Sequence, residues 1–144
     1  MKHILFAAFL LAGTAACTSN LDYKTERDEV MKFHDVVMGD HGKLIDNQMK
    51  LDSMFKTMPA LKTKFPQIDT VQEKMDIKAT RARLSGAEEV MNDWMHQFEP
   101  DVTGKSNEEA VNYFKAERVK IEKIDSLYKI EIKLSDAYLS KFGK

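Results

Sequence analysis

The sequence VMKFHDVVMGDHGKLIDNQMKLDSMFKTM, from Val30 to Met58, decides the fold. Apolar residues recur in it every seven positions, at Val30, Val37, Leu44, Leu51 and Met58. Four further residues occupy the intervening four-residue offset, namely His34, His41, Gln48 and Phe55. At about 100° per residue, these nine positions fall within about 120° of one helix face. We call this set of nine the seam, and it predicts a long helix that packs against other helices.

The composition favours long helices with charged surfaces. Of the 144 residues, 31% are charged and 43% hydrophobic, while glycine (6) and proline (3) are scarce. This balance is typical of one all-helical domain rather than of a sheet protein. Lysine and arginine (22) nearly equal aspartate and glutamate (23), so no basic field exists to attract nucleic acid. A nucleic-acid partner is therefore not expected.

The first sixteen residues have the pattern of a signal peptide. A short basic start is followed by an apolar run from Ile4 to Ala12 and by small residues up to Ala16. The apolar run is too short to cross a bilayer as a helix, which takes about 20 residues. The sequence therefore predicts an exported protein from which residues 1–16 are removed.

The only cysteine, Cys17, follows this run directly. The segment Leu11–Cys17 (LAGTAAC) resembles a bacterial lipoprotein signal, in which the cysteine becomes the lipidated N-terminus. Thr14 stands where leucine is commonest, which leaves ordinary cleavage after Ala16 as the alternative. We expect lipid on Cys17, a tether over residues 17–24, and anchoring to the membrane of a Gram-negative-type bacterium, on its periplasmic or surface side.

Three helices are expected after the tether. The first runs to about Lys56, and Pro59 and Pro66 bound a turn over residues 58–67. The second runs from about Ile68 to Phe98. The third begins at a capping box formed by Ser106 and Glu109 and continues to about Phe142. Short turns between long helices predict an antiparallel up-down-up three-helix bundle over residues 25–142, with coiled-coil-like packing.

The apolar faces of the later helices are less regular than the seam. In the second helix, one face holds Ile68, Val71, Met75, Ala79 and Ala82, and another holds Leu84, Ala87, Met91, Trp94 and Phe98. The two faces differ by more than about 100°, which predicts either a bend near Ser85 and Gly86 or a wide buried face. The third helix is expected to bury Ala110, Phe114, Ile121, Ile124, Tyr128, Leu134, Tyr138 and Phe142.

Two stretches resemble a known family. Phe33–Asp40 (FHDVVMGD) is similar to the segment HDEVMPKMGD, and Ala87–Phe98 (AEEVMNDWMHQF) to AEEAMMDWMRNF, in small bacterial lipoproteins often labelled "viral A-type inclusion protein". Gly39 stands where that family often has proline. The resemblance implies a helical, exported, lipid-anchored protein, and it brings no enzymatic activity or site with it.

Histidines and methionines are the residues that invite a specific chemical hypothesis. Imidazole and thioether groups together suit Cu(I), so a metal site could use His34, Met38, His41, Met91, Met95 and His96. His34 and His41 are about 10.5 Å apart along a helix and Met31 and His41 about 15 Å, so these groups cannot all hold one ion. At most His34 and Met38 form half a site, which Met91, Met95 or His96 of the second helix would have to complete. The structural alternative is that these histidines hydrogen-bond within the core and that the methionines fill gaps.

Trp94 and Phe98 form an aromatic pair that is either part of the core or the floor of a binding pocket. Neighbouring carboxylates such as Glu88 and Glu89 diverge by about 100° on a helix, so they do not make an acid–base pair. The sequence also lacks the usual phosphate-loop, zinc-protease and nucleophile motifs. We therefore expect a non-catalytic protein without a cofactor, whose role in the cell envelope is structural or is the binding of an envelope protein.

Overall fold

The computed structural model describes residues 22–143, and these fold into four helices without a strand. Helix α1 spans Tyr23–Lys56, α2 Met58–Lys64, α3 Thr70–Gln97 and α4 Asn107–Ser140. The expected all-helical class is confirmed, with four helices where three were predicted. None of the helices in this part of the chain is long and apolar enough to cross a membrane.

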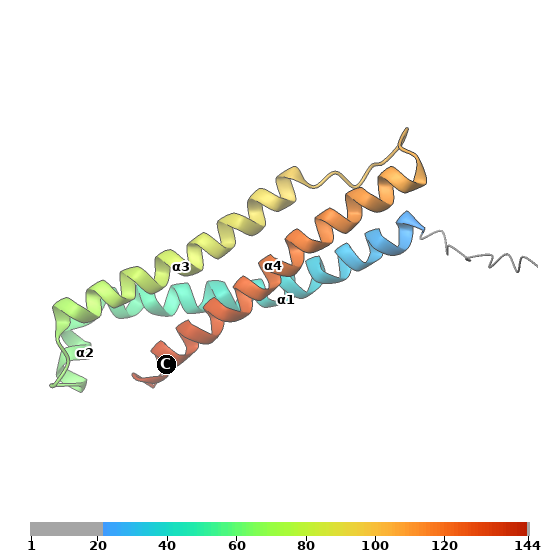
Figure 1. Cartoon of the computed structure of the whole chain (residues 1–144). Coiled ribbons are helices and arrows are strands. Elements are labelled where there is room, and N and C mark those ends of the chain that lie inside the picture. Colours follow the sequence, from blue (N-terminus) through green and yellow to red (C-terminus); the bar gives the residue numbers. More distant parts are fainter. Residues whose placement is uncertain (1–21, 144) are drawn as a thin grey trace, which may run out of the picture.

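The three long helices lie along one another (Figure 1). Helices α1 and α4 run in the same direction, since Tyr23 bonds to Asn107 at one end and Asn47 to Ser135 further along. Helix α3, which comes between them in the sequence, runs in the opposite direction. More backbone lies close together between α1 and α4 than between any other two helices. With 34 residues each, α1 and α4 are about 50 Å long.

Helix α1 confirms the seam. The side chain of Asp22 caps its start by accepting from the backbone N–H of Lys24 at 3.1 Å. All five heptad residues of the seam are buried, whereas the four residues at the intervening offset are only half-buried. The seam therefore consists of a line of five buried residues and a margin of four residues that keep some contact with solvent. Both seam histidines belong to this margin.

The expected turn over residues 58–67 contains the short helix α2, so that part of the prediction was wrong. Pro59 falls in the first turn of α2, where its missing N–H group has no helical partner to lose. Met58 and Leu61 are buried, and the ring of Phe65 meets that of Phe142 edge-on with centroids 5.4 Å apart. Helix α2 thus closes the end of the bundle at which α4 finishes.

Helix α3 has close to the expected bounds, but the face predicted for its first half is wrong. Val71 and Met75 are 68% and 58% exposed, and Ala79 and Ala82 are exposed as well. One continuous stripe is buried instead, at spacings of three and four residues: Ile77, Thr80, Leu84, Ala87, Met91 and Trp94. Thr80 occupies a core position because its hydroxyl donates to the carbonyl of Asp76 at 2.8 Å. The buried face therefore does not change at Ser85 and Gly86.

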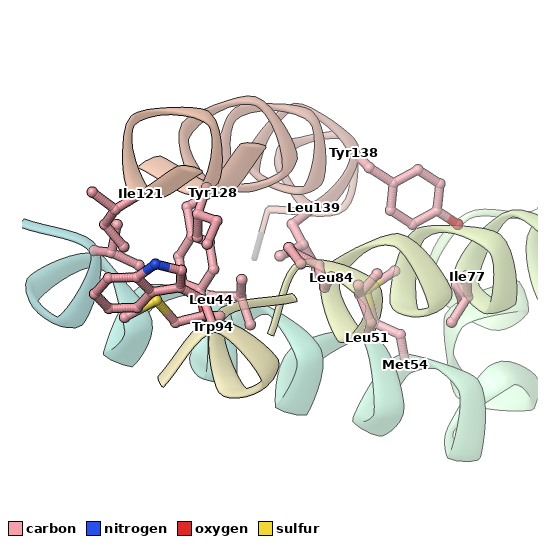
Figure 2. Close-up of a cluster of buried hydrophobic side chains, with 14 of the residues drawn as sticks. Leu44, Leu51, Met54, Ile77, Leu84, Trp94, Ile121, Tyr128, Tyr138 and Leu139 are labelled. Atoms are coloured by element: carbon pink, nitrogen blue, oxygen red, sulfur yellow. The ribbon is translucent and has the colours of Figure 1, made fainter. Parts of the chain in front are cut away.

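Helix α4 begins at the predicted capping box, in which the backbone N–H groups of Ser106 and Glu109 each donate to the other residue's side chain. Its expected core positions are buried with one exception, Leu134, which is 46% exposed while the next residue, Ser135, is fully buried. Side chains from all four helices form one core, and Figure 2 shows a group of them. Every residue of this core lies between Val30 and Phe142, so a fragment of residues 22–144 contains all of it.

Candidate functional site

Trp94 joins α3 to α4 through a buried polar contact. Its ring is 6% exposed, and its indole N–H donates to Oε2 of Glu117 at 2.9 Å. The other oxygen of Glu117 accepts from Nζ of Lys120 at 2.7 Å. Each carboxylate oxygen of Glu117 therefore has a donor, which a buried charge requires. Figure 2 shows the Trp94 ring between the helices.

Other aromatic rings continue from Trp94 toward the end of the bundle at which the chain enters. Phe98 stacks on Trp94 with centroids 4.8 Å apart and lies 6.2 Å from Phe114, which stacks on Tyr23 at 6.3 Å. The hydroxyl of Tyr113 accepts from the backbone N–H of Glu99 at 2.8 Å and fastens the connection between α3 and α4. Trp94 and Phe98 thus belong to the packed core, with a shallow groove beside Trp94 lined in part by Lys120 and Lys123.

The three histidines of the candidate metal site have three different partners. Nδ1 of His34 lies 3.0 Å from the carboxylate of Asp35, and its ring is 6.2 Å from that of Trp94. Nδ1 of His41 lies 3.4 Å from the hydroxyl of Tyr128 on α4. Nδ1 of His96 lies 2.7 Å from the carbonyl of Asn92 within α3. The histidines are therefore distributed over separate surroundings.

The methionines divide in the same way. Met91 is buried in the core, whereas Met38 and Met95 are partly exposed. Met38 lies one turn beyond His34 on α1, so these two side chains are neighbours on one helix. Met95 follows the buried Trp94 on the antiparallel α3 and, being turned by about 100° from it, lies on a more exposed side of that helix. Within residues 22–143, no three His, Cys, Asp or Glu side chains gather as a metal-binding group.

The partner of His41 could not be found from local sequence, because Tyr128 is 87 residues away. The Tyr128 side chain is fully buried, and this burial, together with the negative charge of Glu88, raises its pKa to about 12. Glu88 in turn accepts from the side-chain amide of Gln48 at 3.2 Å. Gln48 on α1 is thereby linked to α3, and His41 on α1 to α4.

A buried amide forms a second polar contact between α1 and α4. Asn47 is fully buried, and its Nδ2 donates to the hydroxyl of Ser135 and to the carboxylate of Asp136, both at 2.8 Å. Lys43 pairs with the same carboxylate at 3.0 Å. Partial burial opposes ionisation of Asp136, but the hydrogen bonds from Asn47 and Lys43 outweigh it and lower the pKa. The sequence signal for this contact is an asparagine next to a seam residue.

Buried carboxylates elsewhere in the bundle also face cations. Glu26 lies 3.3 Å from Arg118, Glu131 lies 3.1 Å from Arg83, and Asp125 pairs with Lys129 at 2.8 Å. Glu26 and Glu131 each meet a cation on another helix. These pairs fix how the helices lie relative to one another, and they leave no two of these carboxylates facing each other for acid–base chemistry.

The site and the fold together define a class: an all-helical bundle whose polar contacts join one helix to the next. No family model, curated protein or solved structure matches the chain.

Proposed function

We propose that the protein is a non-catalytic, lipid-anchored helical module of the cell envelope, with a structural or protein-binding role. The observation that carries this proposal is the position of Cys17. It is the only cysteine, it ends a leader-like segment, and it precedes the start of α1 at Tyr23 by six residues. Cys17 itself lies outside the described residues, so the lipid is inferred from sequence.

The elongated fold of the chain that follows Cys17 in sequence supports this proposal. We take the three long helices as an up-down-up unit with coiled-coil-like packing, which makes a rod about 50 Å long. Its polar contacts are used between helices, and a rod of this kind presents long helical faces to other proteins. The resemblance to small bacterial lipoproteins points the same way.

Replacing the cysteine tests the anchor. The full chain with Cys17→Ala should move from the membrane fraction to the soluble fraction and should no longer incorporate labelled palmitate. Thr18→Ala, at the neighbouring position, is the matched control and should remain in the membrane. If the protein with Cys17→Ala stays in the membrane, the proposal is wrong. A wild-type N-terminus that begins at an unmodified Cys17 by mass spectrometry would also contradict it.

A copper-binding role is the second candidate, and one observation favours it. His34 and Met38 lie one turn apart on α1, and both are partly exposed, so they could supply one imidazole and one thioether to a Cu(I) ion. Calorimetry with Cu(I) should then give binding tighter than micromolar that His34→Gln removes. His96→Gln, on a histidine outside this group, is the control and should bind as the wild type does. Equal binding by both variants would exclude the site.

A further inference from the structure

An apolar stripe runs along the outer face of α4, and three of its four residues are left exposed by the other described helices. Val119, Ile130 and Leu134 are 49%, 53% and 46% exposed, and Leu127 is half-buried beside them. Their spacings of eight, three and four residues place them on one side of the helix over about 22 Å. We call these four residues the α4 stripe. A shallow groove, lined in part by Lys123 and Ser126, lies along it.

The charges beside the α4 stripe are mainly positive. Lys115, Lys123 and Lys133 lie on the same side of α4, within about 120° of its circumference together with the stripe. None of the three forms an ion pair with any residue that the structure describes. Glu122, on this side of α4, is 3.5 Å from Arg118, and Asp93 of α3 lines the adjoining groove. The positive charge beside the stripe is therefore only partly offset by neighbouring carboxylates.

This pattern argues against a second copy of the chain as the occupant. Two copies that met through the stripe would bring the same three unpaired lysines together, and like charges repel. Four half-exposed side chains are also far less than the roughly 800 Å² per partner that a stable protein interface buries. A flat anionic surface fits both the lysines and the small apolar area, because lysine stems and apolar side chains enter the boundary of a membrane together.

The length of chain before α1 permits such a contact. The six residues from Cys17 to Tyr23 reach at most about 20 Å. Tyr23 donates its backbone N–H to Asn107 at 3.2 Å, so α1 and α4 start side by side. Adjacent helix axes are about 8–10 Å apart. With an anchor at Cys17, the rod could therefore lie down with the outer face of α4 on the membrane.

We propose that the α4 stripe is a contact surface for an anionic membrane. Val119, Ile130 and Leu134 enter the headgroup boundary, and the lysines beside them pair with lipid phosphates. The inference rests on the proposed lipid anchor, to which it adds a second attachment, and stable membrane binding commonly takes two such signals. The consequence is a bundle held along the membrane surface rather than standing away from it.

Vesicle flotation of a fragment of residues 22–144, which lacks the anchor, tests this contact. The fragment should float with phosphatidylglycerol-containing vesicles but not with pure phosphatidylcholine vesicles, and high salt should release it. Lys123→Gln with Lys133→Gln should weaken binding about 25-fold, because each lysine near such a surface contributes about 1 kcal/mol. Ile130→Gln with Leu134→Gln should abolish flotation while circular dichroism shows unchanged helix content.

Matched controls separate the stripe from general stickiness and charge. Val71→Gln with Met75→Gln changes apolar residues of α3 that are even more exposed, and Lys50→Gln with Lys56→Gln removes two lysines of α1. Both controls should float as the wild-type fragment does. Equal losses in these controls, no binding to anionic vesicles, or a dimer that the Ile130 and Leu134 changes dissolve would overturn the proposal. Since the fragment has no Cys17, such a result leaves the test of the anchor independent.

Discussion

Helix α4 contacts α1 and α3 in two different ways. Against α1 it runs parallel, and the two backbones lie close together over a long distance, with contacts such as Asn47 to Ser135 and the stacked rings of Tyr23 and Phe114. Against α3 it runs antiparallel, and large polar-tipped side chains join the two helices, namely Trp94 to Glu117 and Tyr138 to Glu73. The distance between packed helices depends on the side chains in the contact. Less of the backbone of α3 than of the backbone of α1 lies close to α4.

The difference indicates which helix is most easily separated from the bundle. The contact between α1 and α4 combines a continuous line of buried residues with the buried Asn47, whereas less of the backbone of α3 lies close to either of the other two long helices. Regions with fewer close contacts open at lower free energy than the rest of a domain. We expect the amides of α3 to exchange with solvent before those of α1 and α4.

The largest effect is expected for Trp94→Ala. Removing a buried aromatic ring leaves a cavity and should lower the free energy of unfolding by about 3–5 kcal/mol. It also removes the donor to Glu117. Denaturant unfolding measures the loss, and hydrogen exchange should show it first in α3. Trp94→Phe, which keeps most of the packing, is the control and should lose about 1–3 kcal/mol. Uniform exchange over all helices in Trp94→Ala would contradict the weaker attachment of α3.

A smaller effect is expected at high pH from Tyr128, on the α1 side of the comparison. Because its pKa in the folded protein is about 12 and the unfolded value is about 10, the neutral hydroxyl favours folding fully below pH 10. This contribution, about 2–3 kcal/mol, should disappear as the pH rises from 10 to 12. Unfolding curves for the wild type and Tyr128→Phe should therefore converge or cross in that range. Parallel pH profiles would mean that the ring is not buried as described.

The smallest effect on stability is expected for Asn47→Leu. The side-chain oxygen of Asn47 is buried without a hydrogen-bond partner, so an apolar residue of similar size removes one unfavourable group along with two hydrogen bonds. The free energy of unfolding should change by less than about 1 kcal/mol. A buried amide can instead select one helix register. Broadened NMR signals in Asn47→Leu would support this, whereas a loss above 3 kcal/mol would show that Asn47 mainly stabilises the fold.

The seam shows what local sequence predicts well. Its seven-residue repeat predicted the length of α1 and the five heptad positions that are buried. Such a repeat depends only on one helix having one face that packs against other helices. The capping box gave the start of α4 for the same local reason. These features depend on residues less than one or two turns apart.

Elements that depend on distant partners were predicted less well. Thr80 and Ser135 occupy core positions because each hydroxyl donates to a carbonyl of its own helix, while the apolar Val71 and Leu134 are exposed. A hydrophobic pattern alone therefore selected the wrong face of α3 in its first half. Among the candidate site residues, the sequence left Trp94 open between a core position and the floor of a pocket. It could not supply Glu117 or Tyr128, which only the packing of α4 brings near.

Trp94 has a practical consequence because it is the only tryptophan in the chain. Indole emission moves to longer wavelength when the ring passes from a dry surrounding into water, and this ring lies between α3 and α4 next to a carboxylate. The fluorescence of the unlabelled protein therefore reports on this one contact, whereas far-ultraviolet circular dichroism reports on all four helices. If α3 separates while its helix remains intact, the colour of the emission should change before the helical signal does.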